Sequence, residues 1–206
     1  MRYKVWEKLA HKYNNLWVQK YSLGPTRREV KKILFPLLEK GKDINILDIG
    51  CGTGQLIGEI SEKYNNYSYL GIDVANNMIE EAKKNNSGIK ANFKVCPVED
   101  FFTEEKYDVI ICTHSFPYFP RKEEMLVKIS GMCQKEGKVI IINSSTNNLK
   151  DLITNFFLKA TTSKAKYLSI LQMKELFKVA ELKVVNIGII KEKWYMPTIA
   201  VFHLER

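Results

Sequence analysis

From residue 45 to the C-terminus, short apolar runs alternate with segments in which apolar residues recur every three or four positions. The apolar runs predict strands at 45–49, 68–72, 92–96, 107–112, 137–142, 183–190 and 198–204. Helices are expected between them, and the one that contains Ala75, Met78, Ile79 and Ala82 has the clearest apolar face. This alternation predicts an α/β fold with a doubly wound, mostly parallel sheet and helices on both faces.

Two segments depart from the alternation. Residues 1–42 contain two amphipathic patterns, one from Trp6 to Trp17 and one from Val30 to Leu38, where Pro36 should kink or shorten the helix. Residues 144–169 are rich in Ser, Thr, Asn and Lys and enclose one amphipathic helix, whose apolar stripe is Leu149, Leu152, Ile153, Phe156 and Phe157. We therefore expect an N-terminal helical segment at 1–42 and a main domain at 43–206 with a helical insert at 144–169.

Length and composition narrow the class of protein. The 206 residues are 45% hydrophobic and 27% charged, which is ordinary for one globular domain with a small appendage. The longest apolar runs are strand-sized, and the opening residues are too charged for a secretory signal, so we expect a cytoplasmic protein. The four cysteines are widely spaced, which predicts neither a disulfide framework nor a metal site.

A glycine-rich turn follows the first strand of the main domain. The stretch reads Asp48-Ile-Gly50-Cys-Gly52-Thr-Gly54 and leads into a helical pattern. Glycines allow positive φ angles and a close approach of backbone N–H groups to a ligand, and the helix N-terminus favours an anionic group. The dinucleotide fingerprint G-x-G-x-x-G would need its third glycine at Gln55, so a dehydrogenase that uses a nicotinamide cofactor is the least favoured reading.

An acidic residue follows at the end of the second strand. Asp73 lies nineteen residues beyond Gly54, where a carboxylate accepts hydrogen bonds from both ribose hydroxyls of an adenosine-containing cofactor. The turn and the acid lie on the expected elements, a strand–turn–helix unit and a strand end. Together they predict a cofactor site at this edge of the sheet.

At these residues the sequence resembles the class I S-adenosylmethionine-dependent methyltransferases, whose first motif reads D-x-G-x-G-x-G. The resemblance covers residues 45–204 and implies a seven-stranded sheet with an antiparallel last strand. It implies S-adenosylmethionine as the cofactor, with Asp73 on the ribose and Met78 beside the adenosine. Further cofactor contacts are expected at Asp48, Gly50, Cys51, Gly52, Gly54, Val74, Val98, Glu99 and Thr113. For Cys51, packing against the helix is favoured over a nucleophilic role, because no partner that would form a thiolate is identifiable. The resemblance also implies that the N-terminal segment often forms a lid, for which Tyr13 and Tyr21 are candidates alongside simple packing.

The segments after the third and fourth strands depart from or refine the family pattern. Pro97 stands where an adenine-contacting Asp is common, so the Val98 N–H, Glu99 or Asp100 would have to make that contact. After the fourth strand, His114 is the candidate general base and Tyr118 a candidate acceptor contact, with structural roles as the alternatives. This segment lacks the N-P-P-Y sequence of methyltransferases that act on adenine or glutamine nitrogens.

The charge pattern bears on the acceptor. The chain has a net charge of +9, from 27 Lys and 5 Arg against 23 acidic residues. By segment, residues 1–42 have a net charge of +8, residues 144–169 of +3, residues 43–143 of −4 and residues 170–206 of +2. This segregation favours an anionic acceptor or an anionic docking surface.

We therefore predict a methyltransferase that acts on a small-molecule acceptor bounded by residues 1–42 and 144–169. Two alternatives stay open. One is an RNA or other macromolecular methyltransferase. The other is a non-catalytic protein, which either binds the cofactor or binds a membrane surface through Trp6 and Trp17. The lack of a recognisable RNA-binding appendage and the scarcity of Arg disfavour nucleic acid. The sequence determines neither the acceptor atom nor the oligomeric state.

Overall fold

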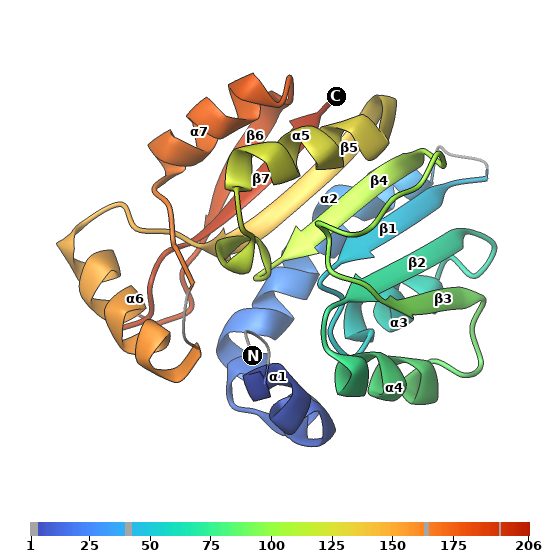
Figure 1. Ribbon diagram of the computed structural model, residues 1–206, viewed down its shortest axis with the longest axis horizontal. Coiled ribbons are helices and arrows are strands. Elements are labelled where there is room, and N and C mark those ends of the chain that lie inside the picture. Colours follow the sequence, from blue (N-terminus) through green and yellow to red (C-terminus); the bar gives the residue numbers. More distant parts are fainter. Residues whose placement is uncertain (1–3, 40–42, 163–164, 194) are drawn as a thin grey trace.

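A computed structural model describes residues 4–39, 43–162, 165–193 and 195–206. Its strands are β1 (Asn45–Ile49), β2 (Ser68–Asp73), β3 (Ala91–Val95), β4 (Tyr107–Thr113), β5 (Cys133–Ser144), β6 (Lys183–Ile190) and β7 (Ile199–Glu205). In the described part of the chain they form one seven-stranded sheet in the order β3-β2-β1-β4-β5-β7-β6 (Figure 1). Strands β1 to β5 pair in parallel, whereas β7 runs antiparallel to both β5 and β6. The predicted fold class, including the antiparallel last strand, is confirmed.

Helices cover both faces of the sheet because alternate residues of each strand point to opposite faces. On one face α2 (Gly24–Leu38), α3 (Gln55–Ser61) and α4 (Asn76–Asn85) bury their apolar residues with Ile111 of β4. On the other face α5 (Lys122–Met132) and α7 (Ile170–Val179) pack with the neighbouring Ile110. The central strands are buried on both sides, which explains their nearly continuous apolar sequence.

The start of β5 differs from the prediction. The strand begins at Cys133, four residues before the predicted start at Gly137. Cys133 pairs with Tyr107 of β4, and the register then shifts before Lys138 pairs with Val109. The intervening residues are polar and exposed, so the apolar pattern that predicts a strand is missing there.

The N-terminal segment is less regular than the sequence predicts. Helix α1 (Lys4–Leu9) passes into a 3₁₀ helix at Ala10–Asn15 and, after a break, into a π-helical turn at Gln19–Leu23 that leads into α2. The single helix expected from Trp6 to Trp17 is therefore wrong, and Trp17 is 61% exposed. Asn14 and Asn15 end the helical stretch, in keeping with the tendency of Asn side chains to bond outside a helix. Helix α2 runs through Pro36 and ends two residues later.

The insert contains the predicted helix, α6 (Leu149–Thr162), between β5 and α7. Its apolar stripe points outward, since Leu149, Leu152, Ile153 and Phe156 are all exposed. The side chain of Phe157 lies outside the part that the structure describes. Among the described side chains of α6, the buried ones are instead the polar Asp151 and Asn155. This arrangement is the reverse of the usual amphipathic helix, which packs its apolar face on the core.

Candidate functional site

The glycine-rich turn joins β1 to α3, and its three glycines have positive φ angles of 75°, 53° and 73°. Gly50 is the most constrained, because a Cβ atom there would lie 2.3 Å from the Ser115 Oγ. The Ser115 hydroxyl follows β4 and donates to the Ile49 carbonyl at 2.8 Å. A glycine at position 50 thus lets the segments after β1 and β4 approach each other closely.

Two cavities open at the carboxyl ends of the strands, where β1 lies between β2 and β4 and the strand order reverses. Open α/β sheets bind ligands at this point. The larger cavity is lined by the predicted residues Gly50, Gly52, Asp73, Val74, Met78, Val98, Glu99, Thr113, His114 and Tyr118. The smaller cavity is lined by Asp48 and Cys51, and it shares Gly50, Gly52 and Thr113 with the larger one. Within the described residues, Gly54 is the one predicted site residue that lines neither cavity.

Asp73 connects the end of β2 to the glycine-rich turn. Its Oδ2 accepts a hydrogen bond from the Gly52 N–H at 3.0 Å, and its Oδ1 accepts one from the Ala75 N–H at 2.9 Å. Burial raises the pKa of the Asp73 carboxyl, while the backbone hydrogen bonds act in the opposite direction. A carboxylate has about four acceptor sites, so Asp73 retains capacity for hydroxyl donors of a ligand.

Asp48 is the most unusual group at the site. It is 1% exposed, and its Oδ1 has no hydrogen-bond partner among the described residues. Burial, together with the negative charge of Asp73, raises the pKa of Asp48 to about 7. Burial also raises the pKa of the neighbouring Cys51 thiol well above its usual value, which argues against a nucleophilic role for that residue. An orphaned buried oxygen of this kind is a natural partner for a cationic or donor group of a ligand.

His114 follows β4 in a left-handed conformation with φ of 58°. Its Nε2 lies 2.9 Å from the Thr26 hydroxyl of α2, and its backbone N–H donates to the Ile142 carbonyl at 2.7 Å. Burial lowers the pKa of His114 to about 4, so the imidazole is neutral near pH 7. Tyr118 lies further along the same loop, and its ring packs edge-on against Trp6, with centroids 5.8 Å apart.

The segment after β3 forms another wall of the larger cavity. Pro97, Val98 and Glu99 all line it, and the Val98 side chain is buried. Asp100 is exposed and lies outside the lining residues. Of the two acidic candidates for an adenine contact, Glu99 therefore has the better position.

The N-terminal segment packs over both the turn and the larger cavity, which Trp6 and Tyr13 help to line. The Thr53 hydroxyl in the glycine-rich turn donates to the Asn14 Oδ1 at 2.6 Å. The Glu7 carboxylate accepts hydrogen bonds from the first two backbone N–H groups of α4, at 2.9 and 2.8 Å. Tyr21, the second lid candidate, is not among the described lining residues, and the Lys20 and Lys193 ammonium groups lie over its ring.

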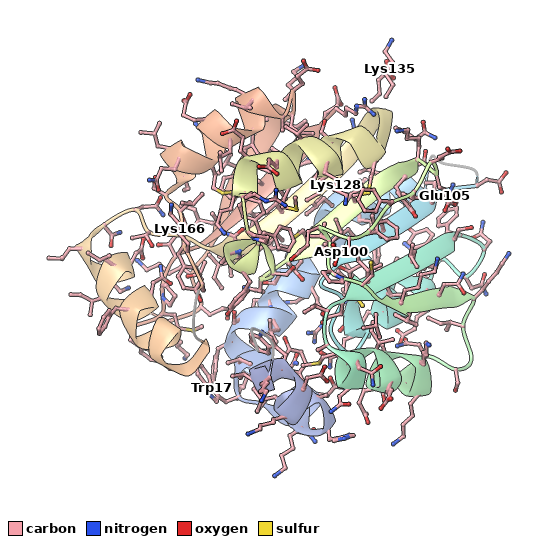
Figure 2. The ribbon with its side chains drawn as sticks, in the orientation of Figure 1. Trp17, Asp100, Glu105, Lys128, Lys135 and Lys166 are labelled. Carbon is pink, nitrogen blue, oxygen red and sulfur yellow. The ribbon has the colours of Figure 1, made fainter. Side chains whose placement is uncertain are left out.

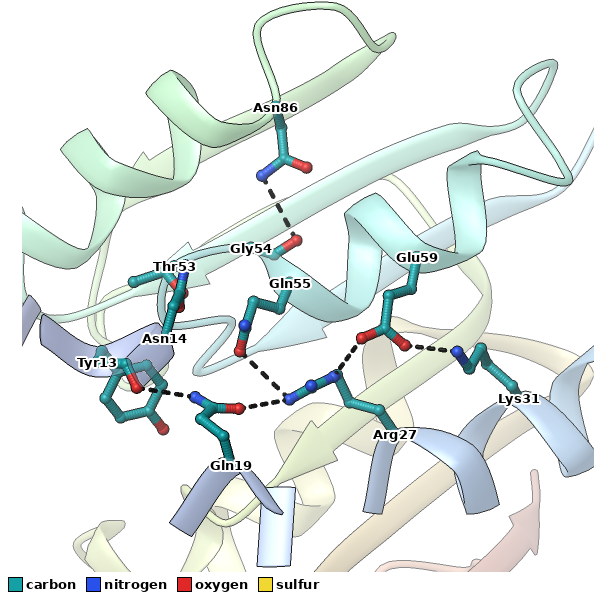
Figure 3. Close-up of polar contacts among 10 residues, drawn as sticks. All are labelled: Tyr13, Asn14, Gln19, Arg27, Lys31, Thr53, Gly54, Gln55, Glu59 and Asn86. Atoms are coloured by element: carbon teal, nitrogen blue, oxygen red, sulfur yellow. Dashed lines mark hydrogen bonds and ion pairs between the residues drawn. The ribbon is translucent and has the colours of Figure 1, made fainter. Parts of the chain in front are cut away.

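Arg27 of α2 lines the smaller cavity, and the sequence reasoning missed it (Figure 3). Its Nε donates to the Glu59 Oε1 of α3 at 2.6 Å, and its Nη1 donates to Gln19 at 2.8 Å and to Gln55 at 3.2 Å. Lys31 donates to the second Glu59 oxygen at 2.5 Å. These contacts join α2 to the first helix after the glycine-rich turn. A basic residue on an amphipathic helix gives no sequence signal that distinguishes it from a surface charge.

The described residues contain no cluster of three or more His, Cys, Asp or Glu side chains that could hold a metal ion. A search of the same residues for membrane-spanning segments finds no helix of sufficient length and apolarity. The larger cavity is instead lined by glycines, acidic groups and aromatic rings, a donor set suited to an organic ligand.

Comparison with known proteins places the chain in a family. A family model described as a methyltransferase domain matches residues 40–198. A malonyl-[acyl-carrier protein] O-methyltransferase of Anoxybacillus flavithermus is 26% identical over 111 residues, which cover 54% of this chain and 43% of that protein. The chain thus spans less than half the length of this curated relative.

Solved structures show the same fold at lower sequence identity. Magnesium protoporphyrin IX methyltransferase of Synechocystis PCC 6803, with bound S-adenosylhomocysteine, superposes with a TM-score of 0.72 at 15% identity over 93% of this chain and 88% of that one. The plantazolicin methyltransferase BpumL gives a TM-score of 0.71 at 19% identity over 97% and 89% of the two chains. Both the motif resemblance and the predicted fold are confirmed. The chain therefore belongs to the methyltransferase domain family.

Proposed function

We propose that the protein transfers the methyl group of S-adenosylmethionine to an oxygen atom of a small-molecule acceptor. The observation that carries this proposal is the convergence of the Asp48–Gly54 turn and Asp73 on adjoining cavities at the switch point of the sheet. The acceptor class is supported by the curated relative, which is named as an O-methyltransferase, and by the two structural neighbours named for a porphyrin and for plantazolicin.

The residues present fit the cofactor. Gly50 and Gly52 line the cavities where the methionine part would lie, and the orphaned Asp48 oxygen offers an acceptor for its ammonium group. Asp73 would hold the ribose hydroxyls, with Val74 and Met78 beside the adenosine. Val98 and Glu99 would contact the adenine in place of the Asp that Pro97 replaces. When bound, the cofactor supplies a methyl group already activated by its sulfonium.

The protein's own task is then to align the acceptor and to exclude water. Trp6 and Tyr13 close the cavity from the N-terminal side, which is the lid role that we propose for residues 1–42. Tyr118 and His114 would contact the acceptor, and the neutral imidazole is able to accept a hydrogen bond. Because its pKa is about 4, His114 would orient an acceptor hydroxyl more than it would store a proton.

The described lining does not favour an anionic acceptor. The acidic residues that line the two cavities are Asp48, Asp73 and Glu99, and the one guanidinium among the described lining residues, Arg27, is paired with Glu59. An acceptor with an apolar or aromatic body suits the rings of Trp6 and Tyr118 better.

The site assignment is tested by calorimetric titration with S-adenosylhomocysteine. We expect the unmodified protein to bind with micromolar affinity and Asp73→Ala to weaken binding at least about tenfold, the loss of one or two charge-assisted hydrogen bonds. Asp100→Ala is the matched control, because Asp100 is an exposed carboxylate outside the lining. Equal affinities for the unmodified protein and Asp73→Ala would remove the assignment.

The acceptor class is tested by a labelled-methyl screen against a cell extract split by size. We expect label in the low-molecular-weight fraction. Label in RNA or protein would favour the macromolecular alternative, and salt-sensitive binding to RNA would accompany it. Binding of S-adenosylhomocysteine without any labelled product would favour a non-catalytic role.

A further inference from the structure

Helix α6 presents an apolar surface to the outside of the molecule. Leu149, Leu152, Ile153 and Phe156 follow the i, i+3, i+4, i+7 spacing of one helix face and are between 50% and 72% exposed. We call these four residues the α6 face. Isolated exposed apolar residues are normal on a protein surface, whereas a helix face made of them marks an interaction site.

The orientation of α6 is fixed by its polar residues. The Asp151 Oδ1 accepts hydrogen bonds from the backbone N–H and the hydroxyl of Thr198, both at 3.0 Å. The Asn155 amide donates to the Ser145 carbonyl at 3.0 Å and to the Thr146 hydroxyl at 2.9 Å. Buried hydrogen bonds on one side of the helix therefore keep the α6 face turned outward.

The charged residues of the insert that contains α6 are mostly basic. Residues 144–169 contain four lysines and one acidic residue. That acid is Asp151, which is 1% exposed and bonded to Thr198. Among the described residues of the insert, Lys166 is exposed, Lys150 is half-buried, and no carboxylate is exposed beside the apolar side chains.

Helix α6 and the N-terminal helices lie toward the same end of the molecule (Figure 2). The backbone N–H of Lys166, just after α6, donates to the Pro117 carbonyl at 2.9 Å, and Trp6 packs on the next residue, Tyr118. Both basic segments therefore meet the loop that helps to line the larger cavity. Trp17, which is 61% exposed, belongs to the same end of the molecule.

We propose that the α6 face docks on an anionic phospholipid bilayer. Amphipathic surfaces bind such membranes by inserting apolar side chains below the headgroups, while lysines contact the anionic lipids. An apolar helix face in a basic segment whose one acidic residue is buried matches that chemistry. Pairing with a second copy of the chain is disfavoured, because a two-fold interface would bring the lysines of both inserts together. The mouth of the larger cavity would then face the lipid, and an acceptor with an apolar body would reach it from the membrane.

The test is co-sedimentation with vesicles of phosphatidylcholine alone and of phosphatidylcholine mixed equally with phosphatidylglycerol. We expect the full chain to bind the mixed vesicles, to bind neutral ones at least about tenfold more weakly, and to be released by high salt. The double substitution Leu152→Ser, Ile153→Ser should lower binding to the mixed vesicles by at least about tenfold.

The matched control is Val127→Ser, Val179→Ser, which removes two half-exposed aliphatic side chains from α5 and α7. It should leave vesicle binding within about twofold, and thermal melts should show both variants folded, because all four substitutions are at exposed positions. Three results would overturn the proposal: no binding to mixed vesicles, an equal loss in both double variants, or light scattering that shows a dimer dissociated by the α6 substitutions. None of these results bears on the cofactor-site assignment, because that assignment is tested separately by binding of S-adenosylhomocysteine in solution.

Discussion

The two basic segments of this chain, residues 1–42 and the insert at 144–169, differ in what their charged residues contact. In residues 1–42, Arg27 and Lys31 share Glu59, and Arg28 pairs with Glu192. In the insert, the one acidic residue is buried and bonded to Thr198, whereas Lys166 and the apolar α6 face are exposed. The basic side chains of Arg27, Arg28 and Lys31 thus form ion pairs with acidic residues beyond the N-terminal segment. The insert instead exposes charge to the solvent at Lys166.

This difference shows why segregated charge alone does not identify a partner. The positive charge of residues 1–42 complements the acidic segment 43–143, so part of it serves contacts within the chain. Lys31 and Lys32, natural choices for a charge-reversal test of an anionic acceptor, both take part in ion pairs, with Glu59 and Glu29. A loss of activity after reversing them would therefore report on packing of the N-terminal segment.

The largest expected effect concerns two buried carboxylates, Asp48 at the smaller cavity and Asp151 on α6. Asp48 has an orphaned oxygen and a pKa raised to about 7 by burial and by Asp73, whereas Asp151 accepts from four donor groups of Asn147 and Thr198. Because the folded protein holds a proton on Asp48 that the unfolded chain loses near pH 4, Asp48 makes the ligand-free protein less stable as pH rises from about 4 to about 7. Asp48→Asn removes this penalty, so its stability relative to the unmodified protein should grow by a few kcal/mol over that range and level off above it.

Urea denaturation of both proteins at several pH values between 4 and 8 measures this difference. His114 acts in the opposite direction in both proteins, because burial lowers its pKa to about 4, and its contribution cancels in the comparison. A stability difference that does not change with pH would contradict the assignment of a raised pKa to Asp48.

The next effect concerns the contribution of the N-terminal segment to cofactor affinity. Arg27→Ala removes the hydrogen bonds that join α2 to Glu59 and Gln55 of α3. We expect a loss of about 1–3 kcal/mol in stability and of at least about tenfold in affinity for S-adenosylhomocysteine, since the turn before α3 loses its cover. Lys32→Ala is the control. The Lys32 side chain is exposed and pairs with Glu29 of the same helix, so this ion pair should contribute less than about 0.5 kcal/mol to stability. Equal affinities in the two variants would show that the N-terminal segment does not support the site.

A smaller effect is expected from the corresponding change in the insert. Asp151→Asn replaces one of two accepting oxygens by a donor, so contacts with either Thr198 or Asn147 are lost. We expect about 1–2 kcal/mol of destabilisation, faster hydrogen exchange at the start of α6, and unchanged binding of S-adenosylhomocysteine. A matching loss of cofactor affinity would mean that the insert also supports the cofactor site.

Much of the fold and of the cofactor site could be predicted because the signals are local. The apolar runs that became β1 and β2 carry the glycine-rich turn and Asp73 at their carboxyl ends, and parallel pairing brings these ends together. Asp48, Cys51 and Glu99 likewise line the cavities because they follow or end strands of the same sheet.

What could not be predicted depends on contacts between distant parts of the chain. Nothing local distinguishes Arg27, which pairs with a residue 32 positions away, from any other lysine or arginine on a helix. The periodicity of α6 shows one apolar face, yet the choice of the buried face is made by Thr198, far along the chain, which bonds Asp151. Trp17 was expected on a helix with Trp6, but the helical stretch ends at Asn15, before it reaches Trp17.

Hydrogen–deuterium exchange with and without S-adenosylhomocysteine tests the contrast between the two segments most directly. The ligand should slow exchange in the glycine-rich turn at 50–54 and in residues 10–30 of the N-terminal segment, because both surround the cavities, and it should leave residues 149–156 of α6 unchanged. Protection of α6 equal to that of the N-terminal segment, or no protection of residues 10–30, would contradict the assignment of one segment to the cofactor and the other to an outside surface.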